Sequence, residues 1–299
     1  MRSRGKSPRT THATLDPVTP QSGLFRTVAD NPKLRPKGGV VLEYEHDGIR
    51  VQYRASAQCD HVDWRTFLAI AALSGIDGER FSARDDVPPL PTLWDRFLTE
   101  GMAQTKDALR LRTTSYAILK EAGLTDTGPN RTRLTETLIR LSSVRQFLFK
   151  GSRVVSGSNL LSFAHDEDSG ELAIALSPQM ARTILGESKQ FIRVSLEDVR
   201  KLKDSAAVIL HGVFSARLRP RDSRPASYHV DTLADLAFGP TTNAATRRKR
   251  RGRIKEALAD LNQLPQWQTL YDDERHVAVI WRGDPDRRAR ISDVSHNPR

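Results

Sequence analysis

Hydrophobic and polar positions recur in two successive segments that predict the same order of elements. Short alternating runs of apolar and polar residues are typical of strands, and apolar residues at i, i+4 and i+7 are typical of helices. In the first segment these patterns predict a strand, two helices and a hairpin, over residues 109–113, 115–122, 130–142 and 144–163. In the second segment they predict a helix, a short strand, two helices and a hairpin, over residues 204–217, 228–230, 232–238, 242–264 and 267–281.

Two helices followed by a β-hairpin are typical of a winged-helix domain, in which the hairpin is the wing. The sequence therefore predicts an α+β protein with two tandem winged-helix domains and flexible basic tails. The predicted parts are a basic disordered arm, a first domain, a second domain and a tail, over residues 1–22, 23–176, 177–282 and 283–299. Lys150 and Arg153 are expected at the tip of the first wing, where they can meet phosphates, whereas Asp272-Asp273-Glu274 makes the second tip acidic.

The long helix predicted from residue 242 carries the densest positive charge of the chain. Seven of the nine residues over 247–255 are cationic, namely Arg247, Arg248, Lys249, Arg250, Arg251, Arg253 and Lys255. Ile254, Leu258 and Leu261 define a buried face farther along, so the front of the helix is expected to project beyond its core. Such a front end, with Thr242 and Asn243 at its start, is what a helix needs to enter a major groove. A solvated charge run or a nuclear-localisation cluster remains an alternative.

The helix predicted over 130–142 is a second candidate. Its leucines share one face, which leaves Arg131, Arg133 and Thr135 on the outside. These three side chains can contact DNA or simply cover a surface, and the residues alone favour neither. One winged helix of a tandem pair can also form dimer contacts, so a homodimer is among the expected partners.

The overall charge narrows the class of partner. The formal net charge is +11 and the isoelectric point is about 10.1, a balance that attracts nucleic acid. Cys59 is the only cysteine, which excludes an internal disulfide, and no apolar run is long enough to span a membrane. A soluble, cytoplasmic protein is expected. The sequence holds no phosphate-binding loop, no metal-ligand spacing and no histidine pair beside a nucleophilic tyrosine, so we expect no enzyme activity, metal or cofactor.

Short motifs in a fixed order point to a family. They are Gly23-Leu24-Phe25-Arg26, Ser115-Tyr116, Leu119-Lys120-Glu121-Ala122-Gly123, Leu160-Leu161-Ser162, Gly170-Glu171-Leu172, Ala175-Leu176-Ser177-Pro178, Arg193-Val194-Ser195-Leu196-Glu197-Asp198-Val199-Arg200, Arg248-Lys249-Arg250-Arg251 and Glu256-Ala257-Leu258. Over residues 15–281 the chain thereby resembles RepC-type replication initiator proteins of IncQ-like plasmids. The resemblance implies binding to iteron repeats in double-stranded origin DNA, opening of a neighbouring AT-rich segment, and recruitment of a helicase and a primase supplied by other chains.

Three other functions remain open at this point. A winged-helix transcriptional repressor without a role in replication has the same sequence features. A DNA-nicking enzyme is disfavoured because its motifs are missing. An RNA-binding protein is the third, and competition between duplex RNA and duplex DNA would distinguish it, because the major groove of A-form RNA does not admit a helix.

Overall fold

The computed structural model describes residues 11–28, 39–46, 49–81, 108–166, 169–220 and 225–283. Its chain forms two units, Met1–Arg200 and Lys201–Arg299, which we call unit 1 and unit 2. Both mix helices with antiparallel sheets, so the predicted α+β class is confirmed. Residues 1–10 of the predicted arm and residues 284–299 of the predicted tail lie outside the described residues.

The centre of unit 1 is helix α1 (His61–Asp77), which is buried on most sides. Asp60 begins the helix, because its carboxylate accepts hydrogen bonds from the backbone N–H groups of Val62 and Asp63. The Asp63 carboxylate in turn accepts from the backbone N–H of Asp60, which completes a reciprocal capping box. The buried ring of Phe25 stacks on Phe67 and packs at a tilt against Trp64.

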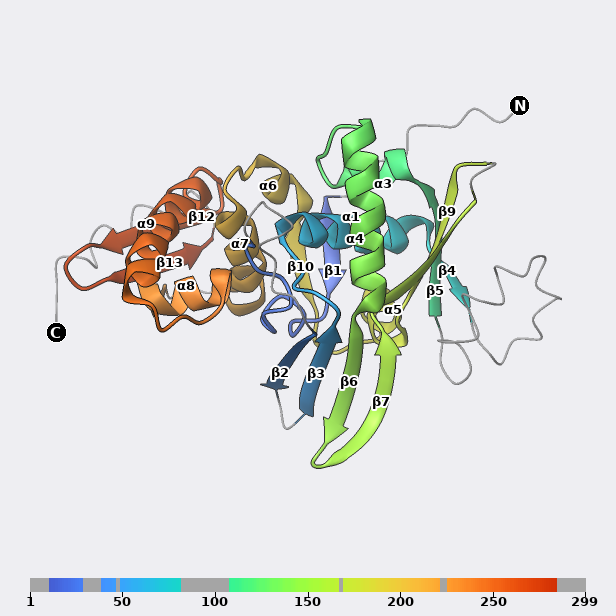
Figure 1. Ribbon diagram of the computed structural model, residues 1–299, viewed down its shortest axis with the longest axis horizontal. Helices are drawn as coiled ribbons and strands as arrows, with labels where there is room; N and C mark the ends of the chain where they lie inside the picture. Colours follow the sequence, from blue (N-terminus) through green and yellow to red (C-terminus); the bar gives the residue numbers. More distant parts are fainter. Residues whose placement is uncertain are drawn as a thin grey trace. The chain divides into compact units, whose positions relative to one another are not determined.

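Two four-stranded sheets belong to unit 1. The first has the order β4-β5-β9-β8, with strands β4 (Glu79–Phe81), β5 (Ala108–Thr114), β9 (Glu171–Leu176) and β8 (Leu161–His165). The second has the order β2-β3-β6-β7, with strands β2 (Val40–His46), β3 (Ile49–Ala55), β6 (Arg145–Lys150) and β7 (Arg153–Asn159). Figure 1 shows β6 and β7 running away from the helices of unit 1 toward its lower end.

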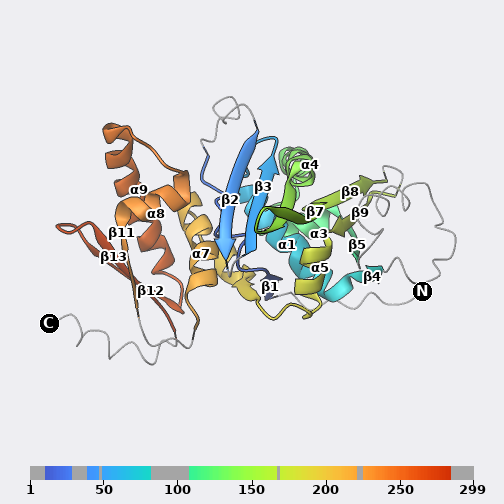
Figure 2. The same cartoon turned by 90° about the horizontal axis from the view of Figure 1, so that it is seen from below.

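Between β5 and β6 the chain forms helices α3 (Ser115–Glu121) and α4 (Gly128–Ser143). The Thr114 hydroxyl caps α3 by accepting from the backbone N–H of Ala117. Leu134, Leu138 and Leu141 of α4 are buried, which confirms the predicted core face. Figure 2 shows α4 nearly end-on beside β3.

The N-terminal segment belongs to the fold, contrary to the predicted arm over residues 1–22. Strand β1 (His12–Leu15) pairs antiparallel with β10 (Ile192–Ser195), and its Ala13 and Leu15 are fully buried. This pairing places β10 in unit 1, together with α5 (Pro178–Ile184) and α6 (Leu196–Lys201). The boundary therefore follows Arg200, rather than residue 176 as predicted, because α5 contacts β1 and β5.

Over residues 201–220 and 225–283, unit 2 forms three helices and one sheet of order β11-β13-β12, apart from Lys201, which ends α6. Its elements are α7 (Ser205–Arg217), β11 (Ala226–His229), α8 (Val230–Phe238), α9 (Ala244–Leu261), β12 (Trp267–Asp272) and β13 (Val277–Arg282). The rings of Phe214 and Trp267 pack against each other in the core, and Ile254, Leu258 and Leu261 of α9 are buried there. His211 is buried against Trp267, which is a packing position.

The same order of elements recurs in the two units. In unit 1 it is α1, β5, α3, α4, β8 and β9, with sheet order β5-β9-β8. In unit 2 it is α7, β11, α8, α9, β12 and β13, with sheet order β11-β13-β12. The hairpin that corresponds to β12–β13 is therefore β8–β9. The predicted first wing, with Lys150 and Arg153 at its tip, is instead β6–β7, an insertion that extends the sheet of β2 and β3.

Candidate nucleic-acid interface

Helix α9 begins outside the core of unit 2. Asn243 caps it, because its side-chain oxygen accepts a hydrogen bond of 2.9 Å from the backbone N–H of Thr246. The buried residues of α9 begin only at Ile254, and Thr242 and Asn243 are exposed. The leading turns of α9 therefore stand clear of the hydrophobic core of their own unit, as the sequence predicts.

Four of the seven cations on α9 have partners in or beside helices α7 and α8 and the β12–β13 hairpin of unit 2. Arg251 forms a two-pronged ion pair with Asp231 of α8, at 2.7 and 2.6 Å. Arg250 donates to the carbonyl oxygen of Gly239 at 2.6 Å. Arg253 pairs with Asp204 and Lys255 with Asp273, at 3.2 and 2.6 Å. These side chains fasten α9 to its neighbours, a role that the sequence cluster did not reveal.

The other three cations form the outward part of the cluster. Arg247, Arg248 and Lys249 are exposed, and Arg247 donates one hydrogen bond of 3.1 Å to the carbonyl oxygen of Thr241. Among the described residues, Arg248 and Lys249 have no hydrogen-bond or ion-pair partner. One turn later, exposed Gly252 has open space where a Cβ would stand. The outer face of α9 thus combines unpaired positive charge with room for close approach, which suits a polyanion.

The Asp231–Arg251 pair makes the stability of unit 2 depend on pH. The hydrogen bond from Arg251 holds the pKa of Asp231 below its usual value. An acid with a depressed folded pKa stabilises the fold above its unfolded pKa, near 4, and loses this contribution as the pH falls through the folded pKa. We expect the free energy of unfolding of the wild type to fall more steeply below about pH 4 than that of Asp231→Asn. Urea unfolding between pH 5 and pH 2 measures this, and equal slopes would contradict it.

The tip of the β12–β13 hairpin is acidic, as predicted. The Asp272 carboxylate accepts hydrogen bonds from the backbone N–H groups of Glu274 and Arg275 and so shapes the turn. The Asp273 carboxylate accepts a hydrogen bond from the Lys255 ammonium and forms an ion pair with it. This tip offers no positive charge to a phosphate apart from Arg275, which lies near Asp272.

The candidate residues of α4 differ from those of α9 because each arginine faces a carboxylate. Arg131 forms a two-pronged pair with Asp126, at 2.6 and 2.8 Å, and Arg133 lies 3.8 Å from Asp60. Thr135 is exposed, and its hydroxyl donates to the carbonyl oxygen of Arg131. With Glu136 also exposed, the outer face of α4 is close to neutral.

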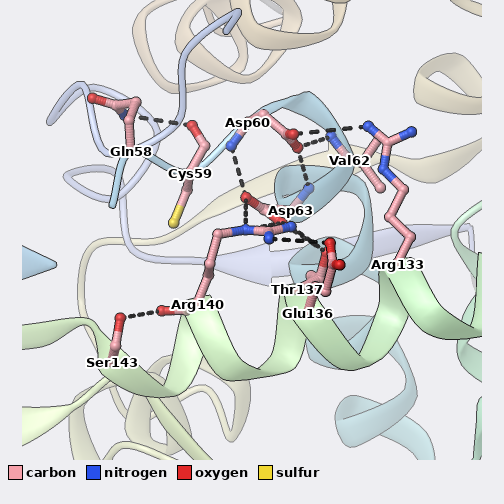
Figure 3. Close-up of polar contacts among 10 residues, drawn as sticks. All are labelled: Gln58, Cys59, Asp60, Val62, Asp63, Arg133, Glu136, Thr137, Arg140 and Ser143. Atoms are coloured by element: carbon pink, nitrogen blue, oxygen red, sulfur yellow. Dashed lines mark hydrogen bonds and ion pairs between the residues drawn. The ribbon is translucent and has the colours of Figure 1, made fainter. Parts of the chain in front are cut away.

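The third arginine of α4 holds the helix against α1, as Figure 3 shows. The side chain of Arg140 donates to both carboxylate oxygens of Asp63, at 2.7 to 3.2 Å. The Thr137 hydroxyl donates to the same carboxylate at 2.7 Å. Asp63 is fully buried and the Arg140 side chain is only 14% exposed, so this network anchors α4 in unit 1.

Lys150 and Arg153 lie at the turn of the β6–β7 hairpin, where they pair in register and are exposed. Gly151 adopts a φ of 60° between them, a conformation that favours glycine. Because β6 starts directly after α4, this turn lies at the far end of the strand from α4 (Figure 1). The two cations therefore do not extend the surface of α4 and belong to the β2-β3-β6-β7 sheet.

Metal sites and membrane-spanning helices were also sought among the described residues. They contain no group of three or more histidine, cysteine or acidic side chains placed to hold a metal ion. Within the same ranges, no helix has the length and apolar character needed to cross a membrane.

Comparisons with known proteins give one family and one fold. A family model described as replication protein C (RepC) matches residues 8–277. A crystal structure of selenomethionine derivatives of domains 2 and 3 of RctB matches with a TM-score of 0.55 at 11% identity, covering 90% of this chain and 99% of that one. A second structure of RctB domains 2–3 gives a TM-score of 0.47 at 12% identity, covering 88% and 95%. A search of curated protein sequences finds no match.

Proposed function

This chain belongs to the replication protein C (RepC) family, and we propose that it is a plasmid replication initiator that binds iteron repeats in double-stranded origin DNA. The observation that carries the DNA contact is the outward part of the α9 cluster, Arg247, Arg248 and Lys249, on the part of the helix that lies outside its core. A helix with such a front end presents side chains to base edges and phosphates at once.

We further propose that both units are winged-helix domains. The order helix, strand, helix, helix, strand, strand in each unit supports this assignment, as does the shared order of the three strands in the sheets. In unit 2, α9 is then the recognition helix and β12–β13 the wing. In unit 1 the corresponding helix is α4, whose near-neutral outer face supports at most a minor contribution to phosphate binding.

Within unit 2 we assign two roles to the predicted DNA-binding residues. Arg247, Arg248 and Lys249 neutralise phosphates or read guanine edges, and Thr242 lies close enough to the helix start to contact a phosphate. Arg250, Arg251, Arg253 and Lys255 mainly position the helix, because each contacts a residue in or beside another element of unit 2. Arg247 contacts only Thr241, directly before α9.

The remaining steps of initiation are part of the same proposal. The protein opens a neighbouring AT-rich segment without hydrolysing ATP itself, needs no metal or cofactor, and passes the open strand to a helicase and a primase from other chains. It acts in the cytoplasm, as a monomer or a homodimer, and its plasmids are IncQ-like. The family membership supports the replication step, whereas these partners follow from the resemblance of its motifs.

Two measurements test this function together. DNase I footprinting of the DNA that flanks the gene should show regularly spaced protection over direct repeats. A circle carrying only the gene, its flanking DNA and a resistance marker should be maintained in cells, and a stop codon early in the gene should abolish maintenance. Protection of a single promoter site without maintenance would instead indicate a repressor, and a nicked product from supercoiled circles with Mg²⁺ would indicate a nicking enzyme.

A further inference from the structure

The solvent-facing side of the β2-β3-β6-β7 sheet carries an alternation of arginine and phenylalanine. Along β6, Gln146 is buried and donates to the Tyr53 hydroxyl at 3.0 Å, which fixes its side of the sheet as the inner one. Successive side chains of a strand alternate between faces, so Arg145, Phe147 and Phe149 lie on the outer side. The outer face of β6 therefore carries one arginine followed by two phenylalanines.

The neighbouring strand places further arginines beside these rings. Phe149 lies opposite Arg50 in the antiparallel register of β3 and β6, and Arg145 lies opposite Arg54. The guanidinium carbon of Arg50 stands 4.2 Å from the centre of the Phe149 ring, and that of Arg54 stands 5.3 Å from the centre of the Phe147 ring. Both rings are only partly buried, so flat π surfaces and guanidinium planes lie together at the surface.

A glycine on the other side keeps one ring close to the sheet. Gly157 of β7 lies opposite Phe147, and a Cβ at this position would stand 3.0 Å from the Cδ1 atom of the ring. Because no side chain rises there, the ring can lie over the β7 backbone.

The arginines of this face lie on two of its four strands, β3 and β6. They are Arg50, Arg54 and Arg145, whereas Lys150 and Arg153 pair at the hairpin turn, which by the same alternation lies on the side opposite to Phe149. The carboxylates Glu43 and Glu45 lie on the edge strand β2, and Glu43 stands 3.5 Å from Arg50. The arginines of this face are therefore concentrated over β3 and β6.

We propose that this face, which we call the β6 platform, binds single-stranded DNA. Bases stack on aromatic rings and on guanidinium planes whatever their sequence, and a basic groove or face follows the phosphates. Bases in an intact duplex are already stacked and paired, so their π faces are not available to the platform. The inference rests on the proposed function, because the opening of an origin is the step that supplies a single strand.

Anisotropy of a fluorescein-labelled oligothymidylate of about 20 nucleotides tests the platform in the full-length protein. The double variant Phe147→Leu/Phe149→Leu keeps apolar cover on the sheet and removes the π faces. We expect its affinity for the oligothymidylate to fall by about 10-fold or more, since stacking of one base contributes a factor of this order. The variant Arg50→Gln/Arg54→Gln should also weaken binding, and it remains informative if the first variant does not fold.

A matched control is available on α3. The Tyr116 ring is 53% exposed and lies 5.4 Å from the Lys120 ammonium, so it is also a surface aromatic beside a cation. Tyr116→Leu should leave oligothymidylate binding unchanged. Equal affinities of wild type, both platform variants and this control would overturn the proposal, as would an absence of binding by the wild type.

Two further readouts separate the platform from its alternatives and from the function of α9. Platform variants should keep the affinity of the wild type for the flanking origin duplex; a parallel loss of duplex binding would show that the face contacts double-stranded DNA instead. A concentration-dependent dimer in gel filtration that the platform variants abolish would show that a second copy covers the face. If the wild type binds the oligothymidylate but no origin duplex, the proposed function fails while the platform stands.

Discussion

The triple variant Arg247→Ala/Arg248→Ala/Lys249→Ala is expected to bind the flanking origin duplex about 100-fold more weakly than the wild type at roughly 0.15 M salt. Each phosphate contact contributes about 0.9 to the magnitude of the slope of log K against log salt, so three lost contacts reduce this magnitude by about 3. At roughly 0.15 M salt, a change of this size in the slope corresponds to a loss of affinity of about 100-fold. These three side chains are exposed, so folding should change little. Electrophoretic shift or anisotropy titrations between about 0.05 and 0.3 M salt give both quantities.

The control for this prediction comes from the same helix. Arg251→Ala removes the partner of Asp231, so it should lower the unfolding midpoint of unit 2 while changing the salt slope by less than one contact. If the triple variant keeps the affinity and slope of the wild type, α9 is not the DNA-binding helix. If Arg251→Ala has the larger effect on the slope, the division of roles within the cluster is wrong.

Replacement of Asp63 by alanine is expected to destabilise unit 1 by about 3–5 kcal/mol, which is the usual effect of removing one partner of a buried ion pair. The loss leaves the largely buried Arg140 guanidinium without its carboxylate and frees the hydroxyl of Thr137. It also removes one half of the capping box of α1. Urea unfolding followed by the total tryptophan fluorescence, to which Trp64 of the same helix contributes together with three other tryptophans, measures the change.

A second arginine–aspartate pair of α4 serves as the matched control. Arg131 and Asp126 make the same kind of two-pronged contact, but the Arg131 side chain is 62% exposed. Water and salt screen such a pair, so Arg131→Ala should have a far smaller effect on stability than Asp63→Ala. Similar losses in both variants would show that burial does not set the strength of these pairs.

The helices could be predicted well because their signals are local. Ile254, Leu258 and Leu261 of α9 are buried and lie in consecutive turns of the helix. Three other helices are capped by residues of the types that favour this position, namely Thr114, Ser177 and Asp204. At the start of α4 the prediction was wrong, because the N-cap position is taken by Thr127, whose side chain makes no capping hydrogen bond. Asn130 was expected to begin α4, but the helix starts at Gly128, and the Asn130 amide donates to the carbonyl oxygen of Thr125.

The membership of strands in sheets could not be predicted in the same way. The turn at Gly151 is local and marks β6–β7 as a hairpin, but the partner that extends its sheet is β3, about 90 residues earlier. The pairing of β1 with β10 joins residues about 180 positions apart, and this pairing moved the boundary between the units. A strand alternates in the same way whichever neighbour it pairs with, so no periodicity distinguishes these alternatives.

The sequence by itself determined the α+β class, the positions of the main helices, the positive charge and the family of this protein. Tertiary structure alone decided which cations of α9 remain outward. The other four are held by Gly239, Asp231, Asp204 and Asp273, which come from other parts of unit 2. It also gathered Arg50 and Phe149 on one sheet face. The physical reason is that helix periodicity and capping act within a few residues, whereas ion pairs and strand pairing depend on distances in space between residues far apart in the chain.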